Sequence, residues 1–287
     1  MLSTCGEPDG FTPFVFDRGW GGPAQQMRAT MDLLKMGTKL VQALEEKLSP
    51  KQRYWARVRA EYCDLRRDEF AEHLMFVLGG FMVQGNLNGF ECCIKNMPAE
   101  GAVLEIGSFL GLSTTLIAYA MAKYGRGEPF FACDPWVFAG ADRPKAGYFS
   151  TGTQEYRDWV VQSFKMNTTL FSKDHPPYAI EATSDQFFRW WSNCAVRTDL
   201  WGRDTKLGGG IGFAFIDGAH TYEAARNDFL NADRFLLPRG YLFFDDSYDD
   251  GAFAEVQRVV SEVRANSRYE LIGKFPNYCF RKRQFSI

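Results

Sequence analysis

Two acidic residues stand where buried strands are expected to end. Glu105 lies two residues before Gly107 in the apolar run 102–106, and Asp134 directly follows the apolar run Phe130–Cys133. A buried carboxylate costs free energy unless hydrogen bonds compensate it. The carboxyl ends of parallel strands form a ligand crevice in doubly wound sheets, so both acids are candidates for binding a polar small molecule. A pair of capping or salt-bridging carboxylates is the open alternative.

The segment that contains Glu105 also carries two glycines. It reads V-L-E-I-G-S-F-L-G-L-S from Val103 to Ser113, turning at Gly107 and passing Gly111 before a helix begins. Glycine lacks a Cβ, so such a turn brings the main chain close to a ligand. The G-x-x-x-G spacing lacks two glycine positions of the G-x-G-x-x-G dinucleotide fingerprint. A dinucleotide-dependent oxidoreductase is therefore the weaker hypothesis.

A second group of chemically capable residues follows two later strands. Asp217 ends the run Phe213–Ile216, with His220 three residues later, and Asp245 and Asp246 follow Gly240–Phe244. Carboxylates crowded at one sheet edge repel one another unless a cation binds, and oxygen ligands suit Mg²⁺. An imidazole beside them would be a general base. Alternatively, His220 and Asp246 cap helices and no metal binds.

The elements that must position these residues alternate between short apolar runs and helical periodicity from Ala102 onward, the pattern of a parallel βαβ sheet. Only Phe275–Asn277 separates the last two strands, which predicts an antiparallel hairpin. The predicted strands are Ala102–Ile106, Phe130–Cys133, Tyr178–Glu181, Phe213–Ile216, Gly240–Phe244, Tyr269–Lys274 and Tyr278–Arg281. The predicted helices are Ser113–Lys123, Gln154–Phe164, Asp185–Trp191, Tyr222–Phe235 and Phe253–Ala265.

The first third of the chain has a different pattern. Residues 1–23 predict an irregular arm, and apolar spacing from Met27 to Leu48 predicts a helix, with a second beginning at Ser49–Pro50 and a third through Phe70 and Leu78. We therefore expect an arm and helical cap over 1–97 and a ligand-binding domain over 98–287. The 17-residue stretch Val137–Thr153 is long for a loop and is expected to be functional or mobile.

The acid-x-Gly-x-x-x-Gly motif and the acid after the next strand resemble those of class I S-adenosylmethionine-dependent methyltransferases, over roughly residues 100–285. The resemblance implies an α/β fold, a doubly wound, Rossmann-like sheet of seven strands in the order 3-2-1-4-5-7-6 with the last strand antiparallel. It also implies that the glycine turn faces the methionine part of the cofactor, Asp134 the ribose, and Ser184 and Asp185 the adenine. The implied cofactor residues are Glu105, Gly107, Ser108, Gly111, Ser113, Asp134, Trp136, Ser184, Asp185 and Asp217.

The pattern Ile216-Asp-Gly-Ala-His-x-Tyr222, together with Phe-Asp-Asp before Ser247, is similar to a branch of metal-dependent O-methyltransferases of natural-product sugars. That resemblance implies Mg²⁺ ligands at Asp217, Asp245 and Asp246, and a catalytic base at His220 acting beside Asp217. Residues 1–97 have no recognised counterpart in this branch. We expect methylation of a small-molecule hydroxyl; a non-catalytic cofactor-binding scaffold and a related hydroxylase remain alternatives.

Composition limits the partners and the compartment. The 33 basic and 35 acidic residues give a net charge of −2, so neither nucleic acid nor an anionic membrane is an expected partner. Seven cysteines without a CxxC pair favour free thiols in a reducing cytoplasm. Self-association through the N-terminal helices is an open expectation. Of the other histidines, His73 is expected to pack in a helix and His175 to lie on a loop.

Overall fold

The computed structural model describes residues 49–137, 152–249 and 251–284. The expected arm, the helix from Met27 to Leu48 and most of the stretch Val137–Thr153 lie outside these residues. The chain divides into two compact units, Met1–Arg53 and Tyr54–Ile287. The unit with the sheet therefore includes residues 54–97, which the sequence pattern assigns to the cap.

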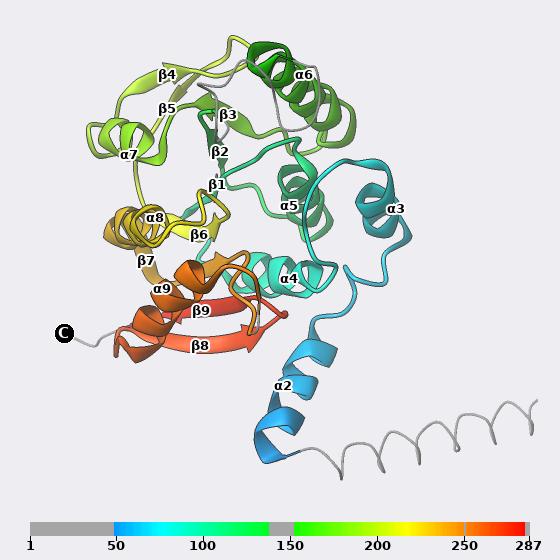
Figure 1. The fold of residues 1–287 in the computed structure, drawn as a ribbon, viewed down its shortest axis with the longest axis vertical. Helices are drawn as coiled ribbons and strands as arrows, with labels where there is room; N and C mark the ends of the chain where they lie inside the picture. The colour runs from blue at the N-terminus through cyan, green and yellow to red at the C-terminus, as the bar shows by residue number, and fades with distance from the viewer. Residues whose placement is uncertain (1–48, 138–151, 250, 285–287) are drawn as a thin grey trace, which may run out of the picture. The chain divides into compact units, whose positions relative to one another are not determined.

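A seven-stranded sheet organises the larger unit (Figure 1). Its strands are β1 (Ala102–Ile106), β2 (Phe130–Asp134), β3 (Tyr178–Glu181), β6 (Ile211–Ile216), β7 (Leu236–Phe244), β8 (Tyr269–Lys274) and β9 (Tyr278–Lys282). The order is β3-β2-β1-β6-β7-β9-β8, with β9 antiparallel to both neighbours and the other pairs parallel. Because β4 and β5 form a separate sheet, this is the order 3-2-1-4-5-7-6 when only the strands of the large sheet are counted. The predicted strand order and the predicted antiparallel hairpin are confirmed.

Helices cover both faces of this sheet (Figure 1). One face carries α4 (Asn86–Asn96), α5 (Leu112–Lys123) and α6 (Thr153–Phe171); the other carries α7 (Ser184–Ser192), α8 (Tyr222–Phe235) and α9 (Ala254–Ala265). Side chains alternate between the faces along each strand. In β1, Val103 packs in the cluster with α4 and α5, whereas Leu104 packs in the cluster with α7, α8 and α9. Both faces are therefore closed, and the strand ends are left for chemistry.

Two further helices, α2 and α3, precede α4 in the described residues. The helix α2 (Pro50–Glu61) begins where predicted, and Ser49 and Gln52 form reciprocal hydrogen bonds of 2.8 and 3.3 Å at its start. The helix α3 (Glu69–Val77) is capped by Asp68, whose carboxylate accepts from two main-chain N–H groups. After α3, Gly79 and Gly80 pass so close to Leu110 and Leu112 that a Cβ would lie 2.8 or 2.9 Å from them. Side chains larger than glycine at these two positions would therefore collide with the leucines on either side of Gly111.

Several local predictions were incomplete. The helix α4 was not predicted separately, because nearly all of its residues are buried, including the polar Asn86, Asn88 and Glu91, so its pattern is not that of a surface helix. The hairpin of β4 (Val196–Thr198) and β5 (Asp204–Lys206) was missed because its strands are short and polar. None of the described helices combines the length and apolar composition that a membrane crossing requires.

The two other histidines are not part of the group of Asp and His side chains that could hold a metal ion in the described residues. His73 is exposed on α3, more than expected, but its ring does pack on Phe70, with centroids 6.4 Å apart. His175 lies in the loop before β3, as predicted, and burial lowers its pKa.

Candidate active site at the carboxyl edge of the sheet

The hydrogen-bond ladder of the sheet continues past the strand ends and aligns the acidic residues. The Asp217 N–H donates to the Ile106 carbonyl at 2.8 Å, and the Asp245 N–H donates to the Ile216 carbonyl at 3.0 Å. Each acid is therefore the first residue beyond its strand, one step along the sheet edge from the next. This arrangement follows from the parallel pairing of β1, β6 and β7.

The turn after β1 lies directly against the end of β6. Gly107 has φ +85°, and a Cβ at this position would lie 1.9 Å from the Asp217 carbonyl oxygen. Only glycine meets both conditions. Gly111 also has a positive φ, +87°, but its Cβ would meet Phe164 of α6 at 3.0 Å. Gly107 thus allows the two strand ends to meet, and Gly111 allows α6 to pack.

Glu105 supports this turn from inside the protein. Its Oε2 accepts hydrogen bonds from the hydroxyls of Ser108, at 2.9 Å, and Thr114. The residue is 0% exposed, and burial raises its pKa to about 7. Ser113 is also buried. Glu105, Ser108 and Ser113 therefore shape the turn, and their side chains do not face the solvent side where a ligand would bind.

Asp134 holds the same turn from the neighbouring strand. It accepts main-chain N–H bonds from Ser108 at 2.8 Å, Phe109 at 3.0 Å and Trp136 at 2.6 Å. Burial raises its pKa, while these three donors oppose that rise. A carboxylate offers about four acceptor positions, so roughly one remains for a ligand hydroxyl. Trp136 is fully buried and donates its Nε1–H to the Phe109 carbonyl at 3.0 Å, which places it in the support of the turn.

Ser184 and Asp185 contact the neighbouring helix. The Ser184 hydroxyl donates to Asp228 of α8, and the Asp185 carboxylate accepts from the amides of Asn227 at 2.5 Å and Asn231 at 3.0 Å. These bonds join the start of α7 to α8. The side chains expected near an adenine are thus engaged in joining two helices.

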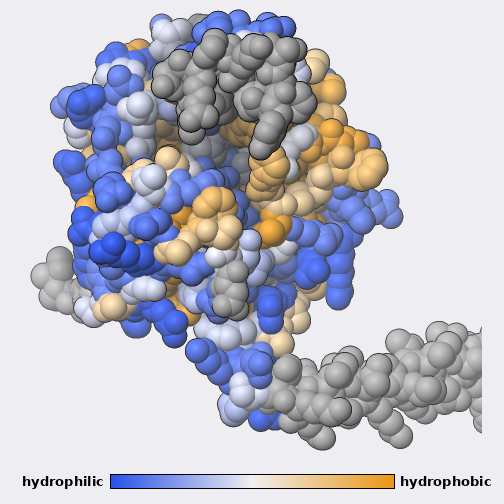
Figure 2. Space-filling model, viewed as in Figure 1, coloured by the Kyte–Doolittle hydropathy of each residue, from blue (hydrophilic) through white to orange (hydrophobic). Residues whose placement is uncertain are grey.

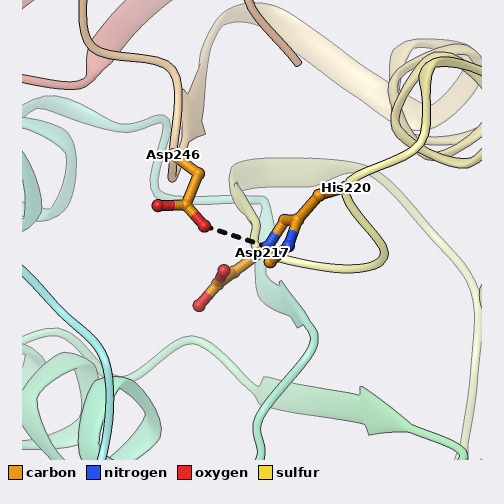
Figure 3. Close-up of side chains that lie close together, drawn as sticks. All are labelled: Asp217, His220 and Asp246. Carbon is orange, nitrogen blue, oxygen red and sulfur yellow. Dashed lines mark ion pairs between the residues drawn. The ribbon is translucent and has the colours of Figure 1, made fainter. Parts of the chain in front are cut away.

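Three side chains converge at the ends of β6 and β7 (Figure 3). Asp217, His220 and Asp246 each offer one ligand atom, and these atoms lie within 4.8 Å of one another. His220 Nε2 is 2.9 Å from Asp246 Oδ2, and the imidazole packs on the Phe253 ring with centroids 4.1 Å apart. We call Asp217, His220 and Asp246 the acid–histidine cluster.

Neither His220 nor Asp246 is the N-cap residue of the helix that follows it, so the capping alternative is wrong. The N-cap of α8 is Thr221, whose hydroxyl accepts from the Ala224 N–H at 3.3 Å, and the N-cap of α9 is Phe253. His220 and Asp246 are therefore available to each other and to a ligand.

Asp245 does not belong to the acid–histidine cluster, although it was expected there. Its Oδ1 accepts hydrogen bonds from the amides of Asn86, at 2.7 Å, and Asn277. Burial raises its pKa to about 6. Sequence reasoning missed Asn86 because α4 was not predicted; asparagines among apolar residues at 86 and 88 were the available signal.

Negative charge dominates this edge. Burial raises the pKa of Asp217 well above its usual range, and the nearby carboxylates of Asp245 and Asp246 raise it further. A divalent cation would relieve this repulsion, and carboxylate oxygens are the ligands that Mg²⁺ takes in proteins. The residues present therefore fit a cation.

Exposed apolar side chains lie near the glycine turn. Figure 2 shows them gathered beside α3, and Phe76, Val77, Phe81 and Val83 are exposed there. The Phe81 ring stacks on Phe109 of the glycine turn with centroids 6.0 Å apart. A separate open groove of about 610 Å³ runs along α6 beside Trp201, and its described lining includes no residue of the acid–histidine cluster.

Comparison with known proteins agrees with this architecture. A family model described as a methyltransferase domain matches residues 104–247, half of the chain. A 79-residue stretch is 33% identical to the uncharacterized protein R132 of Acanthamoeba polyphaga mimivirus. That match covers 25% of this chain and only 36% of the viral protein.

Three solved O-methyltransferase structures are similar to this chain at low identity. An O-methyltransferase from Bacillus cereus bound to SAH is 16% identical, with 80% of this chain and 99% of that chain covered and a TM-score of 0.45. The calicheamicin enzyme CalS11, a TDP-rhamnose 3′-O-methyltransferase, is 13% identical, with 82% and 95% covered and a TM-score of 0.47. TomG from Streptomyces achromogenes, bound to SAM, is 13% identical, with 82% and 100% covered and a TM-score of 0.44.

The family match begins within β1 and includes the glycine turn, Asp134 and the acids after β6 and β7. The strand order is the one expected from the motifs. The chain therefore belongs to the methyltransferase-domain family, within the class I S-adenosylmethionine-dependent methyltransferases.

Proposed function

We propose that this chain transfers a methyl group from S-adenosylmethionine to a hydroxyl of a small molecule, with Mg²⁺ beside the acceptor. The observation that carries the proposal is the acid–histidine cluster, which lies one strand from the glycine turn at the same sheet edge. A turn suited to the cofactor and a cluster suited to a cation and a proton transfer thus adjoin each other.

The described residues fit the cofactor in two respects. Asp134 keeps roughly one acceptor position after its three main-chain bonds, which suits a ribose hydroxyl. The main chain at Gly107 has no side chain to obstruct an approaching ligand. When bound, S-adenosylmethionine supplies the electrophilic methyl group.

The cation would be held by Asp217 and Asp246, whose carboxylate oxygens are the hard ligands that Mg²⁺ prefers. A bound Mg²⁺ would favour ionisation of a hydroxyl beside it. Asp245 would contribute its charge to the site from its position behind Asp246. This assignment keeps two of the three acids that the motif resemblance implies as ligands.

His220 is the group that would take the proton from the acceptor. Asp246 orients the imidazole through the 2.9 Å contact, and Phe253 packs on the ring, so the base has a defined position. As the acceptor oxygen forms its bond to the methyl carbon, the bond from that carbon to sulfur breaks and the hydroxyl proton moves to His220. The pair resembles other base–orienter arrangements, in which a carboxylate holds a catalytic imidazole.

For the acceptor, we propose a natural-product or sugar hydroxyl. The proposal rests on the Asp-Gly-Ala-His and Phe-Asp-Asp patterns, which are similar to those of metal-dependent O-methyltransferases that act on such molecules. The exposed apolar residues beside the glycine turn would suit the non-polar part of an acceptor.

The test measures S-adenosylhomocysteine release by the full chain with a panel of sugar nucleotides and polyphenols. Chelation should abolish release and Mg²⁺ should restore it. Asp217→Asn should abolish it, whereas Asp249→Asn should not, since Asp249 is an exposed acid of the same region paired with Lys274. Full activity in excess chelator would remove the cation from the proposal. Binding of NADH without binding of S-adenosylmethionine would overturn it entirely.

A further inference from the structure

A closed ring of hydrogen bonds lies directly behind Asp246. Asn86 donates to Asp245 Oδ1 at 2.7 Å; Asn277 donates to the same oxygen and to Asn86 Oδ1 at 3.0 Å. Asn86 and Asn277 are 0% exposed and Asp245 is 4% exposed. Buried polar groups satisfied in this way form a rigid unit with one arrangement.

Asn277 also holds the residue on the other side of Asp246. Its Oδ1 accepts the Ser247 N–H at 2.8 Å, and the Ser247 hydroxyl accepts the Tyr278 N–H at 2.8 Å and donates to the Phe244 carbonyl at 2.8 Å. The Asn277 side chain, in the turn of the β8–β9 hairpin, therefore forms hydrogen bonds with both residues that flank Asp246.

The main-chain conformation of Asp246 depends on support from its neighbours. Its φ is +50°, in the left-handed region that favours glycine. Strained conformations persist only where the surrounding structure over-determines them. In this conformation, the Asp246 carboxylate reaches His220 and Asp217 (Figure 3).

The start of α4 packs closely against the turn of the β8–β9 hairpin. A Cβ on Gly85 would lie 2.4 Å from the Phe275 carbonyl oxygen, so only glycine allows Asn86 to come this close. This approach lets Asn86 accept a hydrogen bond from Asn277, which lies 191 positions later in the sequence.

We infer that Asn277, held in place by its hydrogen bond to Asn86, is a positioning residue. Its hydrogen bonds to Asp245 and Ser247 fix the main chain on both sides of Asp246, so that the Asp246 carboxylate points into the proposed cation site. This inference rests on the proposed function, because the property it controls is cation affinity. It assigns a role in the site to α4 and to the β8–β9 hairpin, neither of which supplies a residue to the acid–histidine cluster.

The experiment measures Mn²⁺ binding to the full chain by titration calorimetry, without cofactor or acceptor. Loss of a group that orients a ligand typically weakens metal binding about 10- to 100-fold. Asn277→Ala should weaken Mn²⁺ binding in that range, and Asn86→Ala should weaken it less, because Asn277 keeps its bonds to Asp245 and Ser247.

Asn88→Ala is the matched control. Asn88 is buried on the same helix, but its amide donates to the carbonyls of Arg59 and Tyr62. This variant should lower the stability of the fold and leave Mn²⁺ affinity unchanged.

A double-mutant cycle separates positioning from general damage. If Asn277 acts through Asp246, Asn277→Ala should have no effect on the residual affinity of an Asp246→Ala variant. An equal loss in both backgrounds, or an Asn86→Ala affinity equal to that of Asn88→Ala, would overturn the inference and leave the proposed function standing. Failure of the native chain to bind Mn²⁺ would overturn both.

Discussion

Replacing Gly107 by alanine tests whether the glycine turn and the end of β6 must touch. The added Cβ would lie 1.9 Å from the Asp217 carbonyl oxygen, far inside a van der Waals contact. The obstructing atom belongs to the main chain, which is held by the bond from the Asp217 N–H to the Ile106 carbonyl. No side-chain rotation can relieve the clash, so one strand end must move.

The magnitude has two parts. At φ +85°, the left-handed conformation of alanine destabilises the folded state by about 1–2 kcal/mol. The lower entropy of the unfolded chain offsets about 0.4–1 kcal/mol of this loss. Forcing an extra carbon into a packed site costs about 1–3 kcal/mol more. Together these terms predict that Gly107→Ala destabilises the fold by about 1–5 kcal/mol.

Gly125→Ala isolates the conformational part. Gly125 has φ +66°, and a Cβ there would meet no atom within 4 Å. Gly125→Ala should therefore destabilise the fold by less than about 2 kcal/mol. Urea unfolding of both variants, compared at equal m-value, measures the difference. If Gly107→Ala costs no more than Gly125→Ala, the strand ends do not meet as described, and the derived geometry of the site is wrong.

Two further changes report on the site and its surroundings. His220→Gln should lower kcat by about 10²–10⁴-fold with little change in cofactor affinity, and rapid-quench kinetics with calorimetry would separate the two; near-native kcat would place the base elsewhere. Burial raises the pKa of Asp228 from 3.8 to about 6, so its contribution to stability is complete below pH 4 and falls by about 3 kcal/mol as the pH rises through 6. Asp228→Asn should therefore gain stability relative to the native chain between pH 4 and pH 7, as measured by urea unfolding; a difference that is constant with pH would contradict the assignment.

Local patterns in the sequence were sufficient for most of the sheet. The strands β1, β3 and β8 and the helix α8 lie where predicted, because their hydrophobic periods and flanking residues are local signals. The hairpin Phe275–Asn277 followed from loop length alone. The order of the strands came from the motif resemblance, since periodicity does not specify which strands pair.

The sequence by itself identified the acids at the strand ends and the histidine near them. What Asp245 contacts was decided only by the tertiary structure, because its partners Asn86 and Asn277 lie 159 and 32 positions away. Likewise, Glu105 and Asp134 were recognised as acids that need partners, but the fold decided that hydroxyls and main-chain N–H groups of the turn would be those partners. A residue's type limits which bonds it can form, whereas the groups that surround it depend on packing between distant segments.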